Sequence, residues 1–132
     1  MPVTLLLLLG IIDFGRAYVA SIALEGAARE GARLAIDSSQ TDAAVLARTE
    51  QSAQPMVLTA SSISLCTAAI VPPAYPPPCA ATGQMDPRDG STSGKAVTVT
   101  VHTFVPFFTA FLTQRLGFSG IPVEASDSMQ AW

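Results

Sequence analysis

Residues 3–12 read VTLLLLLGII, and residues 24–36 read LEGAAREGARLAI. The first run is apolar apart from one Thr and one Gly, and after Asp13 only Arg16 interrupts the apolar or small residues that lead into the second run. The second run is rich in Ala, Glu, Arg and Leu, which favour helix. We therefore predict one continuous helix over residues 2–36, which would be about 50 Å long at 1.5 Å per residue.

The rest of the chain is too small to enclose a helix of that length. Of the 132 residues, 49% are hydrophobic and only 13% are charged, whereas soluble domains average about 25% charged residues. A compact domain of the remaining ~95 residues cannot cover a 50 Å rod. The net charge of −3 also argues against a basic surface for nucleic acid. We expect lipid or other copies of the chain to cover part of the helix.

The first apolar run admits two membrane-related interpretations. A signal peptide is disfavoured because no basic residue precedes the run in this sequence. A permanent membrane anchor is disfavoured because Asp13 and Arg16 would cost about 2.5–3.5 kcal/mol each near the middle of a bilayer. These two residues are three apart on one helix face, so they can neutralise each other. The pattern favours a helix that enters the membrane and later leaves it.

Small residues recur every four positions in the second run, at Ala23, Ala27, Gly31 and Ala35. Small residues at this spacing let helix backbones approach closely. We expect one stripe of the helix to face its own domain and other stripes to face neighbouring copies.

The patterns after residue 37 predict a small α+β domain. Thr41 or Asp42 would cap a short helix over residues 41–54, which Pro55 would end. Alternating residues predict an antiparallel sheet of three or four strands, at residues 56–70, at residues 95–104 and within residues 121–132. We also expect a polyproline-like loop at residues 72–78, a turn-rich loop at residues 82–95 and an amphipathic helical turn at residues 107–117. The sequence thus divides into an assembly helix, residues 1–37, and a globular domain, residues 38–132.

The sequence offers little for catalysis. Its two cysteines, Cys66 and Cys79, either form a disulfide, which is the favoured interpretation and would place the domain outside the cytoplasm, or remain buried thiols. His102 is the single histidine and lies on the Thr side of its predicted strand, so a solvated or hydrogen-bonded imidazole is expected. No metal-ligand spacing, phosphate loop or Ser–His–acid set is suggested by the sequence. We expect no enzymatic activity, no cofactor and no metal.

Two motifs carry a resemblance to a known family. Residues 2–16 read PVTLLLLLGIIDFGR, and residues 27–33 read AAREGAR. This pattern resembles the TadE-like family, which comprises pilin-like subunits of the tight-adherence (Tad) secretion and pilus systems related to type IV pili. The resemblance covers about the first 36 residues.

The resemblance implies a life cycle and a set of partners. A prepilin peptidase would trim the precursor, and this chain would be either the processed form or a form truncated at its start. The inner membrane would hold the chain until the assembly machinery and other pilins receive it, and a cell-surface filament for adhesion would result. The residues expected to carry assembly are Leu5, Leu6, Leu8, Leu9, Ile12, Asp13, Phe14, Arg16, Ala23, Ala27, Arg29, Glu30, Gly31, Arg33 and Ala35.

Two alternatives remain open at this point. The chain could be a minor pilin or pseudopilin that primes a fibre built from another subunit. It could instead be a membrane-anchored binding module outside the cytoplasm, in which the helix is only a tether. The tether hypothesis assigns no role to Asp13, to Arg16 or to the small residues, whereas assembly in a fibre could pair Asp13 with Arg16 between subunits.

Overall fold

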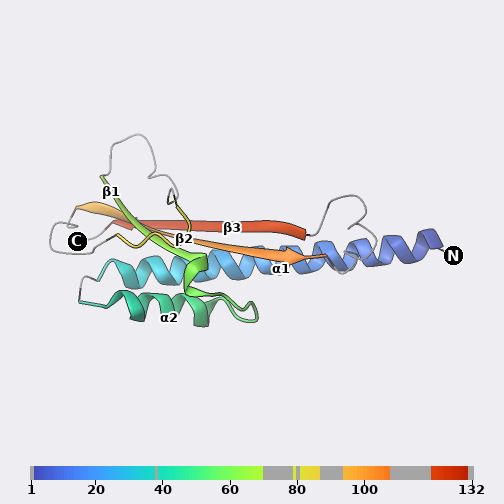
Figure 1. Ribbon diagram of the computed structural model, residues 1–132, viewed down its shortest axis with the longest axis horizontal. Coiled ribbons are helices and arrows are strands. Elements are labelled where there is room, and N and C mark those ends of the chain that lie inside the picture. The colour runs from blue at the N-terminus through green and yellow to red at the C-terminus, as the bar shows by residue number, and fades with distance from the viewer. Residues whose placement is uncertain are drawn as a thin grey trace.

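The computed structural model describes residues 2–37, 39–69, 79, 81–86, 94–107 and 120–130. A long helix, α1 (Pro2–Ala35), is followed by a short helix, α2 (Asp42–Ser52), and by a 3₁₀ turn, η1 (Ala60–Ser62). The strands β1 (Ile63–Ala69), β2 (Lys95–Pro106) and β3 (Gly120–Gln130) complete the described elements. Both helices lie on one side of the sheet, and α1 projects well beyond it toward the N-terminus (Figure 1). The α+β class expected from the sequence is confirmed.

The short helix begins where its capping residue predicts. Thr41 has an extended backbone, and its side chain accepts a hydrogen bond from the N–H of Ala44 at 3.2 Å. This contact satisfies one of the backbone donors that lack a partner at a helix start. Because only a few residues connect the two helices, α2 runs back antiparallel to α1 (Figure 1).

The sheet has the order β1-β2-β3 and is antiparallel throughout. Val99 of β2 pairs with Leu65 of β1 and with Asp127 of β3, which fixes the register on both sides. Within the segment 56–70 expected to contain a strand, β1 begins at Ile63, where the alternation of Ile63, Leu65 and Thr67 starts, and the 3₁₀ turn η1 precedes it. Pro122 lies on β3, which pairs only with β2 in the described part of the chain, as a residue without an N–H requires.

The core lies between the helices and one face of the sheet. Val97, Val99 and Val101 project into it from β2, as their alternation predicts, and they are at most 1% exposed. They pack with Leu24 and Ala28 of α1. Further members of the same cluster are Ala27, Ala32, Ala35, Val45, Ala53, Leu58, Ile63, Leu65 and Ala125.

The opposite face of β2 is also buried, which alternation alone does not predict. Thr98 is 2% exposed and Thr100 is 0% exposed. The backbone N–H of Cys79 donates to the Thr100 hydroxyl at 3.2 Å, so Cys79 lies over this face. Cys79 forms a disulfide with Cys66 of β1, which is the favoured of the two interpretations made from the sequence.

Residues 81–86 line the outer edge of β1. The N–H of Leu65 donates to the carbonyl of Gln84 at 2.7 Å, and the N–H of Asp86 donates to the carbonyl of Leu65 at 2.9 Å. The Asp86 carboxylate accepts from the N–H of Thr67 and from the Gln84 amide, each at 2.9 Å. Asp86 therefore has a structural role in this loop, as its turn-rich context suggests.

Some predicted segments lie outside the described residues. These are the polyproline-like loop at residues 72–78, most of the turn-rich loop after residue 86, and the predicted helical turn beyond Phe107.

Gly31 allows α1 to approach both α2 and β2 closely. A Cβ atom at this position would overlap the Thr49 hydroxyl and would lie 3.1 Å from Cγ1 of Val99. We expect Gly31→Ala to lower the free energy of unfolding by about 1–3 kcal/mol, since extra atoms in a packed core force neighbours apart. Thermal unfolding of the detergent-solubilised chain, followed by circular dichroism, measures this effect.

Gly26→Ala is the matched control, because nothing lies within 4 Å of a Cβ at Gly26. The control should leave stability unchanged or raise it by up to about 1 kcal/mol, since Ala favours helix over Gly. Equal losses in the two variants would contradict the assigned role of Gly31.

The disulfide closes a loop between residues 13 apart in sequence. In the chain-entropy model, closure of a loop of this size stabilises the fold by about 3 kcal/mol. We expect dithiothreitol to lower the denaturation midpoint of the native chain accordingly. A Cys66→Ser/Cys79→Ser variant should start at the lower midpoint and show no response to the reductant.

Candidate assembly surface

The N-terminal half of α1 exposes large apolar side chains on most of its circumference. Leu5, Leu6, Leu8, Ile12 and Phe14 are each between 50% and 73% exposed. Leu9 is half-buried. A helix that is apolar on all sides normally lies inside a protein or a membrane. In this chain such a helix segment lies largely outside its own domain.

One exposed stripe continues along α1 past the apolar run. Its positions alternate in steps of three and four, which keeps them on one helix face. We call it the outer stripe, and its members are Leu5, Leu8, Ile12, Gly15, Val19, Ile22 and Gly26, all of them exposed. The stripe is not among the features predicted above, although its alternating spacing is visible in the sequence and could have identified it.

The small-residue ladder faces the chain's own domain. Ala27 and Ala35 are at most 2% exposed, Gly31 is buried, and Ala23 is half-buried. Together with Ala28 and Ala32, which are also buried, they form what we call the inner stripe. The ladder is therefore the stripe that packs on the domain, and the outer stripe on the opposite side of the helix is the one that another molecule can reach.

Asp13 and Arg16 lie in different environments. Asp13 is only 5% exposed, whereas Arg16 is exposed. Because the Asp13 carboxylate is already buried within a single chain, Arg16 is the member of the pair that a neighbouring molecule can contact. The pairing of Asp13 with Arg16 between subunits stays a prediction.

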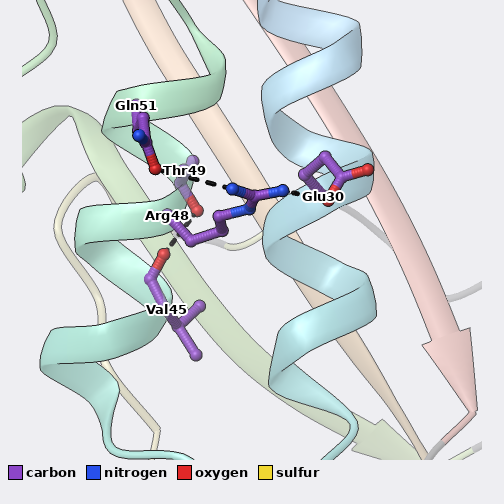
Figure 2. Close-up of polar contacts among 5 residues, drawn as sticks. All are labelled: Glu30, Val45, Arg48, Thr49 and Gln51. Atoms are coloured by element: carbon purple, nitrogen blue, oxygen red, sulfur yellow. Dashed lines mark hydrogen bonds and ion pairs between the residues drawn. The ribbon is translucent and has the colours of Figure 1, made fainter.

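Ion pairs connect the C-terminal part of α1 to the elements on either side. Nε of Arg29 lies 3.5 Å from Oδ2 of Asp127 on β3, and Oε2 of Glu30 lies 3.5 Å from Nη2 of Arg48 on α2. Figure 2 shows the Arg48 side chain reaching from α2 toward Glu30, while the other terminal nitrogen of its guanidinium, Nη1, donates to Oε1 of Gln51. These side chains are between one third and about 70% exposed, so each pair contributes less than about 1 kcal/mol. Arg33, in the last turn of the helix, is exposed.

A buried, hydrogen-bonded hydroxyl lies at the close contact between the two helices. Thr49 is 0% exposed, and its hydroxyl donates to the carbonyl of Val45 at 2.8 Å (Figure 2). The hydroxyl is therefore hydrogen-bonded within α2 while it lies against Gly31 of α1. Apolar packing, rather than the exposed ion pairs, holds the two helices together, and the hydrogen bond within α2 removes the cost of burying the hydroxyl at this contact.

The described residues contain no group of three or more His, Cys, Asp or Glu side chains that could hold a metal ion. His102 lies on β2 with Nδ1 3.6 Å from Oε2 of Glu124 on β3, which is a cross-strand contact at the register position the sheet dictates. Among the described residues, the exposed apolar area of α1 is therefore the surface feature best suited to bind another molecule.

The helix is long and apolar enough to cross a membrane. Over its candidate span, Val3–Ala35, an 18-residue window has a mean hydropathy of 1.8, and only 11% of that window is buried in the domain. The low burial separates α1 from the core helix of a globular protein, which is mostly enclosed.

Residues 1–33 match the TadE-like protein family. No curated protein and no solved structure matches the chain. The resemblance expected from the two sequence motifs is thus confirmed for residues 1–33. The TadE-like segment coincides with nearly all of α1, so the match includes the outer stripe and most of the inner stripe.

Apolar packing of the inner stripe and of the neighbouring Leu24, and not the ion pairs, should hold the domain on α1. We expect Leu24→Ala to lower the free energy of unfolding by about 2–5 kcal/mol, because Leu24 is 0% exposed and its loss leaves a cavity. Arg29→Ala should cost less than about 1 kcal/mol. Chemical denaturation in detergent compares the two variants, and a larger loss for Arg29→Ala would show that charge rather than packing docks the domain.

Proposed function

We propose that this chain is a structural subunit of a Tad-type, type IV-like pilus filament. The α1 helices of successive copies would pack in the fibre core, and the α+β domain would lie on the fibre surface, where it would serve attachment. Before assembly, the chain would be held in the inner membrane, trimmed by a prepilin peptidase and passed to the assembly machinery. Its role would be structural rather than enzymatic.

The exposed apolar area of α1 is the observation that supports this proposal most directly. Eleven large hydrophobic residues between Val3 and Ile22 are each at least 50% exposed. Burial of one large apolar side chain stabilises by about 1.5–3 kcal/mol at about 25 cal/mol per Å², which corresponds to roughly 60–120 Å² of apolar surface. Because the eleven residues are between 50% and 73% exposed, together they expose on the order of 400–800 Å². A stable interface buries about 800 Å² on each partner, so this surface is of the right size to be covered by other molecules.

The glycines of the outer stripe favour other copies of the helix as the final cover. Gly15 and Gly26 each cost the helix about 1 kcal/mol relative to Ala, and nothing in the described chain lies within 4 Å of a Cβ at either position. Lipid chains adapt to any side chain and place no demand on these positions. A neighbouring helix does, because glycine lets two backbones approach closely.

Substitution of these glycines tests the proposal. We expect Gly15→Leu and Gly26→Leu each to abolish fibres or shorten them strongly, because a leucine would separate the packed helices. The isolated chain should retain its membrane association and its thermal stability, since both positions are open in the single chain. Negative-stain microscopy of sheared surface material measures fibre number and length.

The control is Ala43→Leu, at an exposed position near the start of α2 and away from the outer stripe. This variant should assemble normally. Fibres of normal number and length from both glycine variants would contradict packing of the outer stripe against other copies.

A further inference from the structure

The domain exposes large hydrophobic side chains at one end. Among the described residues outside α1, the exposed ones are Val57 (90%), Phe104 (51%) and Ile121 (36%). Val57 follows α2, whereas Phe104 and Ile121 lie on neighbouring strands, where Phe104 pairs with Pro122 and Val105 pairs with Ile121. Segments far apart in the sequence thus contribute to this group.

The strand residues lie at the end of the domain nearest the N-terminus of α1. Asp127 contacts Arg29, and β3 runs from there back toward the N-terminal half of α1 as its residue numbers fall (Figure 1). Ile121 is six residues from Asp127, or roughly 20 Å along the strand. That distance equals about 13 residues of helix, so this end of the sheet reaches approximately the level of Arg16 to Tyr18.

The turn after α2 lies at the same end of the domain. Thr49 lies against Gly31, and α2 runs antiparallel to α1, so the residues after Ser52 extend toward the middle of α1 (Figure 1). Val57 is in this segment and is almost fully exposed. Phe104 and Ile121 project from opposite faces of the sheet, because Ile121 pairs with Val105 and not with Phe104. We call Val57, Phe104 and Ile121 together the apolar end of the domain, since they share this end and not one face.

The exposed apolar side chains of α1 overlap the apolar end of the domain. Val19 and Ile22 are more than 50% exposed. They lie on the C-terminal side of the level of Arg16 to Tyr18, so they are beside the domain and not beyond its end. A bilayer whose headgroup region reaches Val19 and Ile22 must therefore contact the domain itself. At the same level, Arg16 and Tyr18 are exposed, and both are side chains whose apolar part and polar tip suit the headgroup region.

We infer that the apolar end of the domain docks onto the lipid bilayer while the chain is held in the membrane. Val57, Phe104 and Ile121 enter the boundary between headgroups and acyl chains, and the long Arg16 side chain extends outward from that boundary to the phosphates. The domain is then seated on the membrane by contacts on several elements rather than suspended from a single helix. This inference rests on the membrane-held stage of the proposed function.

Single tryptophans report the depth of each position. In full-length chains carrying Trp132→Phe, one tryptophan is introduced by Val57→Trp or Phe104→Trp. Phe14→Trp reports α1 itself, and Ala43→Trp is the matched control at the start of α2, the opposite end of that helix. Each chain is reconstituted in phosphatidylcholine–phosphatidylglycerol vesicles at a high lipid-to-protein ratio, and quenching by lipids with a spin label at a shallow acyl position is measured.

We expect the Val57→Trp, Phe104→Trp and Phe14→Trp chains to show blue-shifted emission and strong quenching, and the Ala43→Trp chain to emit as in water. If only the Phe14→Trp chain is quenched, the docking is wrong while the membrane-held stage stands. If the Phe14→Trp chain is not quenched either, both fail. If the Val57→Trp and Phe104→Trp chains are shielded from water only at high protein-to-lipid ratios, a second copy covers this surface, and the lipid docking is overturned.

Discussion

Packing of the inner stripe of α1 against the sheet and α2 determines how the rest of the chain is arranged. Alanines and Gly31 bring the backbone of α1 close to β2, and a side chain as small as a methyl group at Gly31 would already collide with Thr49. Since packed interiors leave few voids, this close approach fixes the rotation of α1 about its axis. That rotation decides which of its residues remain outside.

The consequence is a helix with two sides that must be covered differently. The inner stripe is buried within the chain, whereas Leu5, Ile12 and Val19 on the outer stripe are all more than half exposed. The apolar residues of the N-terminal half have no cover from the described domain on most sides. Lipid can cover these surfaces before assembly and other copies afterwards, so one helix suits both stages of the proposed life cycle.

The small sheet is stabilised from both faces. The helices cover the valine face of β2, and Cys79, which the disulfide holds to β1, lies over the threonine face. Residues 81–86 also satisfy part of the outer edge of β1 through backbone hydrogen bonds and Asp86. A domain this small gains from such covalent and edge contacts, because its apolar core alone is limited.

The amino-acid sequence by itself determined the elements. Continuous helix-forming residues specified α1, Thr41 specified the start of α2, and the alternation of Val97, Val99 and Val101 specified which face of β2 is buried. The family resemblance was likewise readable from the first 33 residues, because it resides in a local motif. These features depend on neighbours in the chain, which a sequence displays directly.

Tertiary structure alone decided which stripe of α1 is free, because both stripes consist of apolar or small residues and only contact with the sheet distinguishes them. The same holds for the burial of Thr98 and Thr100, which depends on Cys79 from elsewhere in the sequence. The ion partners of Arg29 and Glu30 also come from other elements, β3 and α2. Each of these outcomes is set by contacts between residues distant in sequence, and local sequence patterns do not predict such contacts.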